Sequence, residues 1–430
     1  MSNRGDKKNM SHPRKHEVAP NLRFPEFEGK ENWEKVHLGD LGKLIAGLTY
    51  SPDDVRNNGL LVLRSSNVQN GAISLSDNVY VDPKISGANL SKVNDILICV
   101  RNGSKALIGK NALIPDGMPL CTHGAFMAIF RSKSAKFVFQ LFQTQAYQKQ
   151  VDGDLGATIN SINGSQLKRY KFYVPPSPDE QKKIADCLSS IDELISAERK
   201  KIDALKMHKK GLMQSLFPTE GEKVPKLRFP EFQYADAWNE SQLGEISTIR
   251  SGTTPLRSNS EFYVGGDIPW VKTGDLNNSF IERTEEYITD KANARINPVG
   301  SILVAMYGGF NQIGRTGYLM IPAATNQALS VLNVDDNKVV PSFLLMWLNA
   351  KVETWKKIAS SSRKDPNITG ADVAKFPIKF PCILEQKRIA NCLAALDDLI
   401  TSQAKKINAL TTHKQGLMQQ LFPSQNEVQG

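Results

Sequence analysis

The chain has 430 residues, 40% of them hydrophobic, and this length favours two or more folded domains over one. A mean hydropathy of −0.34, with no run of ~18 uninterrupted apolar residues, excludes an integral membrane protein and a largely disordered chain. The five scattered cysteines form neither a disulfide framework nor a zinc spacing, so we expect a soluble protein of the reducing cytoplasm with no membrane partner.

The positive charge is uneven along the chain. Lys and Arg number 54 against 44 Asp and Glu, a net charge of +10. Residues 1–219 hold 31 basic and 22 acidic residues, a net charge of +9, whereas residues 220–430 hold 23 and 22, a net charge of +1. A basic chain favours an anionic partner such as nucleic acid, and the uneven distribution indicates that any such contact is local.

In chain order, the first predicted element is a polar, basic, flexible arm at residues 1–19, which lacks the apolar core of a secretory signal. An internal repeat with an offset of 205 residues follows. PNLRFPEF at 20–27 recurs as PKLRFPEF at 225–232, EQKKIADCL at 180–188 as EQKRIANCL at 385–393, and GLMQSLFP at 211–218 as GLMQQLFP at 416–423. The repeat unit therefore consists of a short leader, a variable body and a conserved tail.

Each conserved tail is predicted to form one long helix, because apolar residues recur at alternating steps of four and three. Polar residues interrupt this apolar stripe at two equivalent positions, Glu198 and Lys209 in the first helix and Gln403 and Lys414 in the second. The stripe comprises Ile184, Leu188, Ile191, Ile195, Ile202, Leu205, Leu212 and Leu216 in the first helix, and Ile389, Leu393, Leu396, Ile400, Ile407, Leu410, Leu417 and Leu421 in the second.

Two equal stripes in one chain favour mutual pairing as a coiled coil; the alternative is an amphipathic helix that lies on a globular core. Ser177 to Glu180 form an S-x-x-E capping box with proline at the first helical position, which marks the first helix start; the second start, at Cys382, lacks this cap. About 38 residues give a rod of ~57 Å. If the helices pair antiparallel, the second returns to the first body, and the repeat becomes circular with an approximate two-fold symmetry.

The bodies alternate short β-branched and aromatic runs with polar loops, which is typical of strands. A helical stretch follows in each, at 137–150 and 342–358. The fold class is therefore α+β: two mixed, strand-rich bodies joined by two long antiparallel coiled-coil helices in a pseudo-two-fold circular tandem repeat. The segments are an arm at 1–19, a first body at 20–177, a long helix at 178–218, a connector at 219–234, a second body at 235–381, a long helix at 382–423 and a tail at 424–430.

A common scaffold with different loop chemistry is what proteins that read base sequence need, since Arg, Lys, Asn, Gln, Ser and Thr distinguish base edges and basic residues bind phosphates. Residues 62–67 align with 270–275, residues 96–103 with 302–309, and residues 109–110 with 314–315. For each loop residue alone, a solvated surface role is as good an interpretation as DNA contact. The candidate DNA-binding residues are Arg64, Ser65, Asn67, Arg101, Asn102, Lys105, Lys110 and Asn160 in the first body, and Arg257, Lys272, Thr273, Tyr307, Asn311, Gln312, Arg315, Arg363 and Lys364 in the second.

Catalytic and cofactor motifs are absent from the sequence. We find no GxGxxG, GxxxxGK[ST], HExxH or GxSxG pattern and no Asn-Pro-Pro-aromatic motif of an adenine methyltransferase. His12 and His16 lie in the arm at a spacing that suits adventitious metal, and His208 and His413 are interpreted as surface residues. We therefore predict no catalytic residue, no metal site and no cofactor in this chain.

The doubled plan resembles the specificity subunit of type I restriction–modification systems. The resemblance rests on the Ile-Leu-x5-Gly strand in each body and on the Glu-Gln-Lys-x-Ile-Ala-x-Cys-Leu start of each helix, and it covers nearly the whole chain beyond the arm. It implies two target-recognition domains, each of which reads one half of a split site in double-stranded DNA. It also implies that the helices fix the spacer between the halves and dock two methyltransferase subunits.

By the same resemblance, the chain itself is not catalytic: S-adenosylmethionine, ATP and Mg²⁺ belong to partner subunits, which methylate adenine N6, and two restriction subunits can join the complex. Unequal bodies predict a DNA site that is not palindromic. Two other classes remain open. A stand-alone methyltransferase or nuclease is disfavoured by the missing motifs, and the alternative function is a structural or protein-binding tandem scaffold without DNA specificity. The recognised bases and the spacer length do not follow from the sequence.

Overall fold

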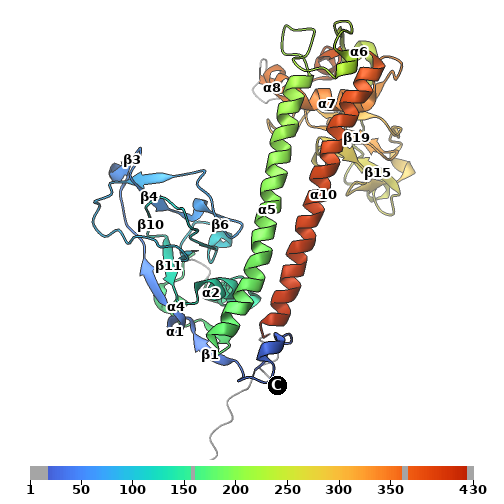
Figure 1. The fold of residues 1–430 in the computed structure, drawn as a ribbon. Helices are drawn as coiled ribbons and strands as arrows, with labels where there is room; N and C mark the ends of the chain where they lie inside the picture. Colours follow the sequence, from blue (N-terminus) through green and yellow to red (C-terminus); the bar gives the residue numbers. More distant parts are fainter. Residues whose placement is uncertain (1–17, 156–159, 361–366, 424–430) are drawn as a thin grey trace, which may run out of the picture. The chain divides into compact units, whose positions relative to one another are not determined.

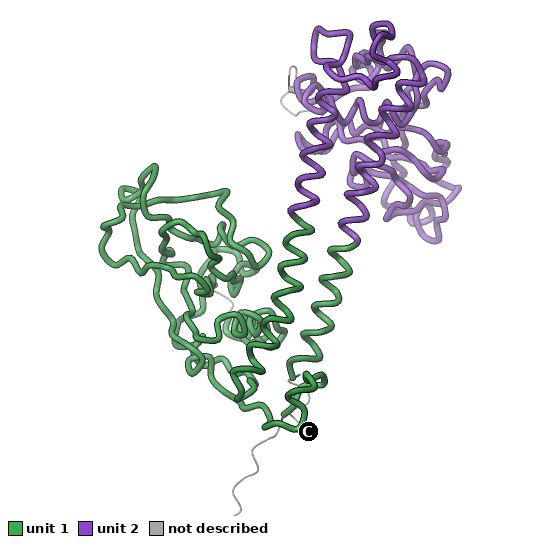
Figure 2. The backbone as a smooth tube through the Cα atoms, viewed as in Figure 1, with its two compact units in different colours: residues 1–199, 406–430 green, residues 200–405 purple. Residues whose placement is uncertain are grey.

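The computed structural model describes residues 18–155, 160–360 and 367–423, and these form two compact units (Figure 2). Unit 1 contains residues 1–199 and 406–430, and unit 2 contains residues 200–405. Each long helix is thus divided between the units, whereas the sequence predicted a single segment for each helix. The predicted arm, apart from its last two residues, and the predicted tail lie outside the described residues. Within the described chain, no helix is long and apolar enough to cross a membrane.

Unit 1 contains two four-stranded sheets. The first has the strand order β2 (Lys43–Ala46), β11 (Met127–Arg131), β8 (Ile96–Cys99) and β9 (Asn111–Leu113), and it is antiparallel throughout. The second has the order β10 (Cys121–His123), β4 (Leu60–Leu63), β7 (Val79–Val81) and β3 (Val55–Arg56), with β10 and β4 parallel. Strand β1 (Glu34–His37) pairs with β12 (Lys171–Val174), and β5 (Val68–Gln69) with β6 (Ala72–Ile73).

Unit 2 repeats the sheet plan of unit 1 with additions. The order β14 (Ser247–Ser251), β21 (Leu329–Val334), β18 (Ile302–Ala305), β19 (Thr316–Leu319) corresponds to the first sheet and gains β16 (Ser279–Ile281) at its edge. The order β17 (Tyr287–Ile288), β15 (Ile268–Val271), β20 (Ala324–Thr325) corresponds to the second, again with one parallel pair, β15 with β20. Strand β13 (Asn239–Gln242) pairs with β22 (Pro377–Phe380).

The helical stretch predicted in each body is two helices rather than one. In unit 1, α2 (Ala135–Leu141) ends before α3 (Gln145–Asp154) begins, because the Thr144 hydroxyl accepts a hydrogen bond from Tyr147 N and caps a new helix. In unit 2, α7 (Pro341–Ala350) and α8 (Val352–Ser360) separate at Lys351. The short helices α1 (Leu38–Leu41) and α4 (Gly164–Lys168) of unit 1 correspond to α6 (Leu243–Ile246) and α9 (Gly370–Ala374) of unit 2.

The two long helices are α5 (Pro178–Leu216) and α10 (Ile383–Leu421), labelled in Figure 1. In unit 1, Ile184 and Leu188 of α5 share a hydrophobic core with Met418 and Leu421 of α10. In unit 2, Leu216 shares a core with Ile389 and Leu393. The beginning of each helix therefore packs against the end of the other, which is the antiparallel arrangement. All apolar stripe residues are buried or half-buried.

Three of the four polar interruptions of the stripe, Glu198, Lys209 and Lys414, form ion pairs across the helices. In unit 1, Lys414 Nζ lies 2.6 Å from Asp192 Oδ2, and Lys406 pairs with the buried Glu198. In unit 2, Lys209 Nζ lies 2.5 Å from Asp397 Oδ1, which is the repeat equivalent of the Asp192 pair. A polar pair inside an apolar seam favours one register, because a shifted register would leave these charges without partners.

The repeated leader motif packs against the repeated helix start. Arg23 of the first leader donates to Glu180, with Nε and Nη2 at 2.8 and 2.7 Å from its two carboxylate oxygens. Arg228 of the second leader binds Glu385 in the same bidentate way, and both glutamates are only 1% exposed. Around each pair lies an outer pair, Lys183 with Glu26 and Arg388 with Glu231.

This arrangement corrects the predicted capping box. The Ser177 hydroxyl does accept from Glu180 N, at 3.4 Å, and Pro178 is the first helical residue. The Glu180 carboxylate, however, binds Arg23 and the Trp33 indole instead of returning to the cap. The buried pair explains why the second helix start keeps its glutamate although it lacks the serine and proline of a box.

Each leader also contacts the end of a long helix, as the circular plan predicts. Leu227 N donates to Ser215 O in unit 2, and Leu22 N donates to Gln420 O in unit 1, each at 2.9 Å. The helix ends are packed alike: Phe217 contacts the ring of Trp238, and Phe422 that of Trp33. The first leader therefore follows the end of α10 in space although the two are far apart in sequence.

Candidate nucleic-acid interface

In the first body, several polar loops converge where β4, β8 and β10 end. Parallel pairing of β4 with β10 puts Leu63 opposite His123, so the loops that follow both strands leave from the same sheet edge. Asn102, after β8, donates from Nδ2 to Ser65 Oγ at 2.9 Å. Its backbone N–H donates to Asn160 O, and Asn160 donates to Gly103 O. Three predicted residues, Ser65, Asn102 and Asn160, thus belong to one hydrogen-bonded cluster.

Two arginines flank this cluster. Arg64 Nη2 lies 2.8 Å from Asp77 Oδ2, on the loop that precedes β7. Arg101 has its guanidinium carbon 5.8 Å from the centre of the exposed Phe126 ring, an arrangement that suits cation–π attraction. Both arginines therefore have a defined position at the same strand ends.

Asn67 differs from its neighbours because it is fully buried. Its side chain accepts from Arg64 N and donates to Ser74 O and Asp77 O, which closes the turn that carries Arg64. The aligned Asp275 accepts the equivalent hydrogen bond from Lys272 N. Asn and Asp both cap turns in this way, and their occurrence at one aligned position is the signal in the sequence for a turn residue. Asn67 is thus a turn residue and not a surface contact, which departs from its place among the predicted DNA contacts.

Lys105 and Lys110, the remaining candidates of the first body, are exposed on the connection between β8 and β9. Lys110 follows Gly109, where a φ of +81° disfavours any other residue and a side chain would press against Val151. Gly314 occupies the equivalent position before Arg315 with φ +75°, and a side chain there would clash with Trp355. The same turn, built on a glycine with positive φ, therefore presents a basic residue in both bodies.

In the second body, Arg257 and Lys272 share one carboxylate. Glu286 Oε2 accepts from Arg257 Nη2 at 2.6 Å, and Lys272 Nζ binds Glu286 Oε1. The hydrogen bond from Lys272, reinforced by that from Arg257, holds the pKa of Glu286 below its ordinary value. The Arg257 guanidinium lies over two aromatic rings, 4.7 Å from the centre of Tyr263 and 5.2 Å from that of Trp270.

The other candidates of the second body lie on neighbouring loops. Tyr307 and Asn311 are exposed, and Arg315 is half-buried. Gln312 has a buried Oε1 without a hydrogen-bond partner in the described part of the chain, and a side chain at Gly308 would contact both Gln312 and Thr273. Thr273 and Gln312 are thus brought together on either side of Gly308. Arg363 and Lys364 lie outside the described residues.

The partners that orient these cations were not predicted from the sequence: Asp77, Phe126, Tyr263, Trp270 and Glu286. None is conserved between the two bodies, so the repeat gave no signal for them. Exposed or half-buried donors of Arg, Asn and Ser, held at fixed positions, can recognise base edges, whereas exposed lysines can bind phosphate. No group of His, Cys, Asp and Glu that could hold a metal ion occurs among the described residues.

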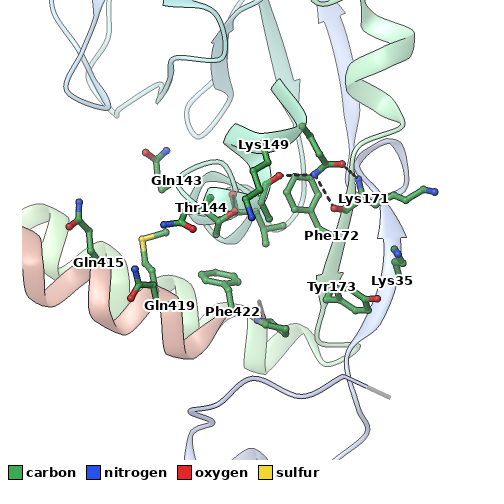
Figure 3. Close-up of a pocket in the computed structure, with 16 residues that line it drawn as sticks. Lys35, Gln143, Thr144, Lys149, Lys171, Phe172, Tyr173, Gln415, Gln419 and Phe422 are labelled. Atoms are coloured by element: carbon green, nitrogen blue, oxygen red, sulfur yellow. Dashed lines mark hydrogen bonds between the residues drawn. The ribbon is translucent and has the colours of Figure 1, made fainter. Parts of the chain in front are cut away.

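A second feature occurs twice, at the ends of the long helices. In unit 1, a cleft of about 840 Å³ lies between the last turns of α10, the α2–α3 segment and the β1–β12 pair (Figure 3). Gln415, Gln419 and Phe422 line it on the α10 side, and Thr144 and Lys149 on the other. Unit 2 has a cleft of about 780 Å³ lined by their α5 equivalents, Lys210, Gln214 and Phe217, and by Asn349 and Lys351. Each repeat thus has an equivalent cleft.

Comparisons with known proteins agree with the doubled architecture. A family model described as "Type I restriction modification DNA specificity domain" matches twice, at residues 30–207 and 235–412. The chain is 25% identical over 417 residues to a putative type I restriction enzyme MjaX specificity subunit of Methanocaldococcus jannaschii, a match that covers 93% of this chain and 94% of the relative. It is 26% identical to the MjaVIII specificity subunit of the same organism, with 94% and 96% covered.

Solved structures give the same architecture. A type I restriction-modification system S subunit from M. genitalium superposes with a TM-score of 0.62 at 17% identity, and the match covers 95% of this chain and all of the other. A chain from a study of complex assembly and conformational transition of the type I R-M system superposes with a TM-score of 0.53 at 17% identity, with 91% and 98% covered. These likenesses establish the fold.

Proposed function

Because this chain belongs to the type I restriction modification DNA specificity family, we propose that it is the subunit that selects the DNA sequence on which a methyltransferase complex acts. Each target-recognition domain, residues 20–177 and 235–381, reads one half of a bipartite site in double-stranded DNA. The observation that carries the proposal is the pairing of a repeated scaffold with two different sets of oriented loop cations. Different loops on one scaffold imply two different half-sites, so the whole site is asymmetric.

In this proposal, the long helices set the distance between the two half-sites. Both helices have 39 residues, on the order of 58 Å of helix. The ion pairs of Asp192 with Lys414 and of Asp397 with Lys209 favour a single register, so the helices act as a fixed ruler and not as a sliding one. A fixed ruler accounts for a spacer of constant length between the half-sites.

We further propose that the two equivalent clefts at the helix ends dock two methyltransferase subunits. The clefts combine a buried aromatic floor, Phe422 or Phe217, with flanking amide and lysine side chains, a composition that suits a protein surface with an apolar centre and a polar rim. Their duplication fits two copies of one partner. S-adenosylmethionine, ATP and Mg²⁺ then belong to the methyltransferase and restriction partners, the chain itself performs no catalysis, and the complex works in the cytoplasm on host DNA.

The proposal is tested by sequencing the methylated adenines of the host genome with and without the gene for this chain. We expect one bipartite, non-palindromic motif to lose its methylation when the chain is deleted and to regain it when the full chain is restored. Restoration with a variant that lacks one helical turn in both α5 and α10 serves as a matched test of the ruler. A motif that persists without the chain, or that is palindromic, would contradict the proposal.

A further inference from the structure

We propose that Arg257 reads a guanine in the half-site of the second target-recognition domain, and that Glu286 is the positioning residue that aims it. The inference rests on the proposed function and extends it from a domain to a named side chain and base. It comes from the one cation in the described candidate set that is fixed on three sides, by a carboxylate and by two aromatic rings.

The aromatic support of Arg257 is itself rigid. The Trp270 indole N–H donates to Thr253 O at 3.2 Å, and the Tyr263 hydroxyl donates to Pro255 O at 2.6 Å. Both bonds tie the rings to the segment that carries Arg257. Trp270 is 2% exposed and packs with Ile288 and Ala324 in a separate small core, so the surface under the guanidinium is a fixed one.

The carboxylate is held by the sheet. Trp270 N donates to Glu286 O at 2.9 Å, which continues the antiparallel pairing of β15 with β17 and places Glu286 directly opposite Trp270. From this position, its side chain binds Arg257 Nη2 on one oxygen and Lys272 on the other. Within the described residues, Nε and Nη1 of Arg257 donate no hydrogen bond, and 58% of the side chain is exposed, so a donor edge of the guanidinium remains available to a ligand.

This geometry favours a base over a phosphate. A carboxylate beside two cations weakens their attraction for phosphate, because it cancels one of two positive charges. What it provides is orientation: the guanidinium plane is fixed by the rings and its edge by Glu286. Fixed planar orientation is needed for bidentate donation to guanine O6 and N7, which is the preferred base partner of arginine.

The first target-recognition domain lacks this device. Arg64, aligned with Lys272, pairs with Asp77, and no aromatic ring of the described chain lies over Arg64. Among the described residues, Arg64 is held by one residue only, through the carboxylate and the backbone oxygen of Asp77, so its guanidinium is less constrained than that of Arg257. The inference is therefore specific to the second domain.

The test uses the full chain expressed with its methyltransferase partners, and the methylation frequency at each base position is measured by sequencing. Arg257→Lys keeps the charge but removes the planar fork, so discrimination for one guanine in one half-site should fall roughly 5- to 150-fold, which corresponds to about 1–3 kcal/mol. Arg257→Ala should give the same loss, and Glu286→Gln a smaller loss at the same guanine. All positions of the other half-site should keep their preference.

The matched control is Glu261→Gln, which removes the same charge from an exposed ion pair with Lys291 in the same domain. It should leave every base preference unchanged. Melting temperatures of the purified chains verify that the variants fold. If Arg257→Ala does not fold, Arg257→Lys still provides the test. A wild-type half-site without a guanine, unchanged discrimination in Arg257→Lys, or a uniform loss at all positions, which indicates a phosphate contact, would each overturn the inference. If the wild-type chain directs no motif at all, the proposed function itself fails.

Discussion

The two repeats are alike where leader, body and helix meet and unlike where the strands end. Arg23 with Glu180 in unit 1 and Arg228 with Glu385 in unit 2 are the same buried pair at the same 205-residue offset. The strand ends, by contrast, differ. Within the described chain, the Arg64 side chain binds only Asp77. Its equivalent, Lys272, binds Glu286, which also binds Arg257, and the Arg257 guanidinium lies over two aromatic rings. Contacts that build the architecture are the same in both repeats, and contacts at the strand ends, where we propose that DNA is read, differ between them.

The difference separates two kinds of constraint on the sequence. A change at a leader or a helix start alters the packing on which the whole unit depends, so both copies retain the same residues. A change at a strand-end loop alters what that loop contacts and leaves the sheet intact. The comparison predicts that variants of the first kind destabilise the fold and that variants of the second kind alter recognition alone.

The largest effect is expected when a buried leader pair is broken. Arg23→Ala or Arg228→Ala leaves a 1%-exposed carboxylate without its cation, which costs about 3–5 kcal/mol of unfolding free energy. The loss should be larger for Arg228→Ala, because Trp33 still donates to Glu180, whereas the Trp238 indole has no partner among the described residues. Hydrogen–deuterium exchange, resolved by peptide, measures the loss in each unit separately.

The matched controls are Lys183→Ala and Arg388→Ala, which remove the outer, exposed pairs of the same two junctions. Their exchange rates should stay close to those of the wild type. If the Arg23 and Arg228 variants behave like these controls, the buried pairs do not hold the leaders, and the account of the repeated scaffold is wrong.

A smaller effect should distinguish the two units by pH. His123 is fully buried at the end of β10, Nε2 lies 3.1 Å from Ile45 O, and burial lowers its pKa below the ordinary 6.5. Below pH 6.5 the unfolded chain binds this proton and the folded one does not, so unit 1 should lose stability as pH falls, by at most about 1.4 kcal/mol per pH unit. Unit 2 has Thr325 at the equivalent strand end and lacks this dependence.

The pH prediction is checked with His123→Thr, which copies the residue of unit 2 into unit 1. The slope of unfolding free energy against pH, measured by denaturant titration between pH 7 and 5, should become shallower in the variant. An unchanged slope would show that His123 is not the group responsible.

Much of the fold could be predicted because it follows from the spacing of apolar residues and from the internal repeat. The stripe of Ile184 and its successors predicts both helices, and its recurrence at a 205-residue offset favours their pairing; the circular path follows once that pairing is antiparallel, as the structure has it. Arg23 and Glu180 both recur in the second repeat, but the sequence did not show that they bind each other, because a role in capping the helix was an alternative explanation for the glutamate. Repeated charged residues of opposite sign were the available signal.

The candidate site could be predicted only in part, because its geometry depends on sheet register. Ser65 and Asn102 are 37 residues apart and meet through the ends of separate strands, and Arg257 and Glu286 are 29 residues apart without any repeated pattern. Asn67 is a residue type typical of surface contacts, but it is buried, and only the structure of the turn that it closes shows this. The residue types indicated which side chains could donate hydrogen bonds to DNA, and the strand pairing determined which of them lie together at the strand ends.

The central claim is that each target-recognition domain reads one half-site independently, and a domain exchange tests it most directly. Residues 235–381 are replaced by the matching domain of a family member with a different DNA site, and the methylated motif is determined by genome sequencing. The account predicts that one half of the motif changes to that of the donor, while the other half and the spacer length stay the same. A change in both halves, or in neither, would contradict it.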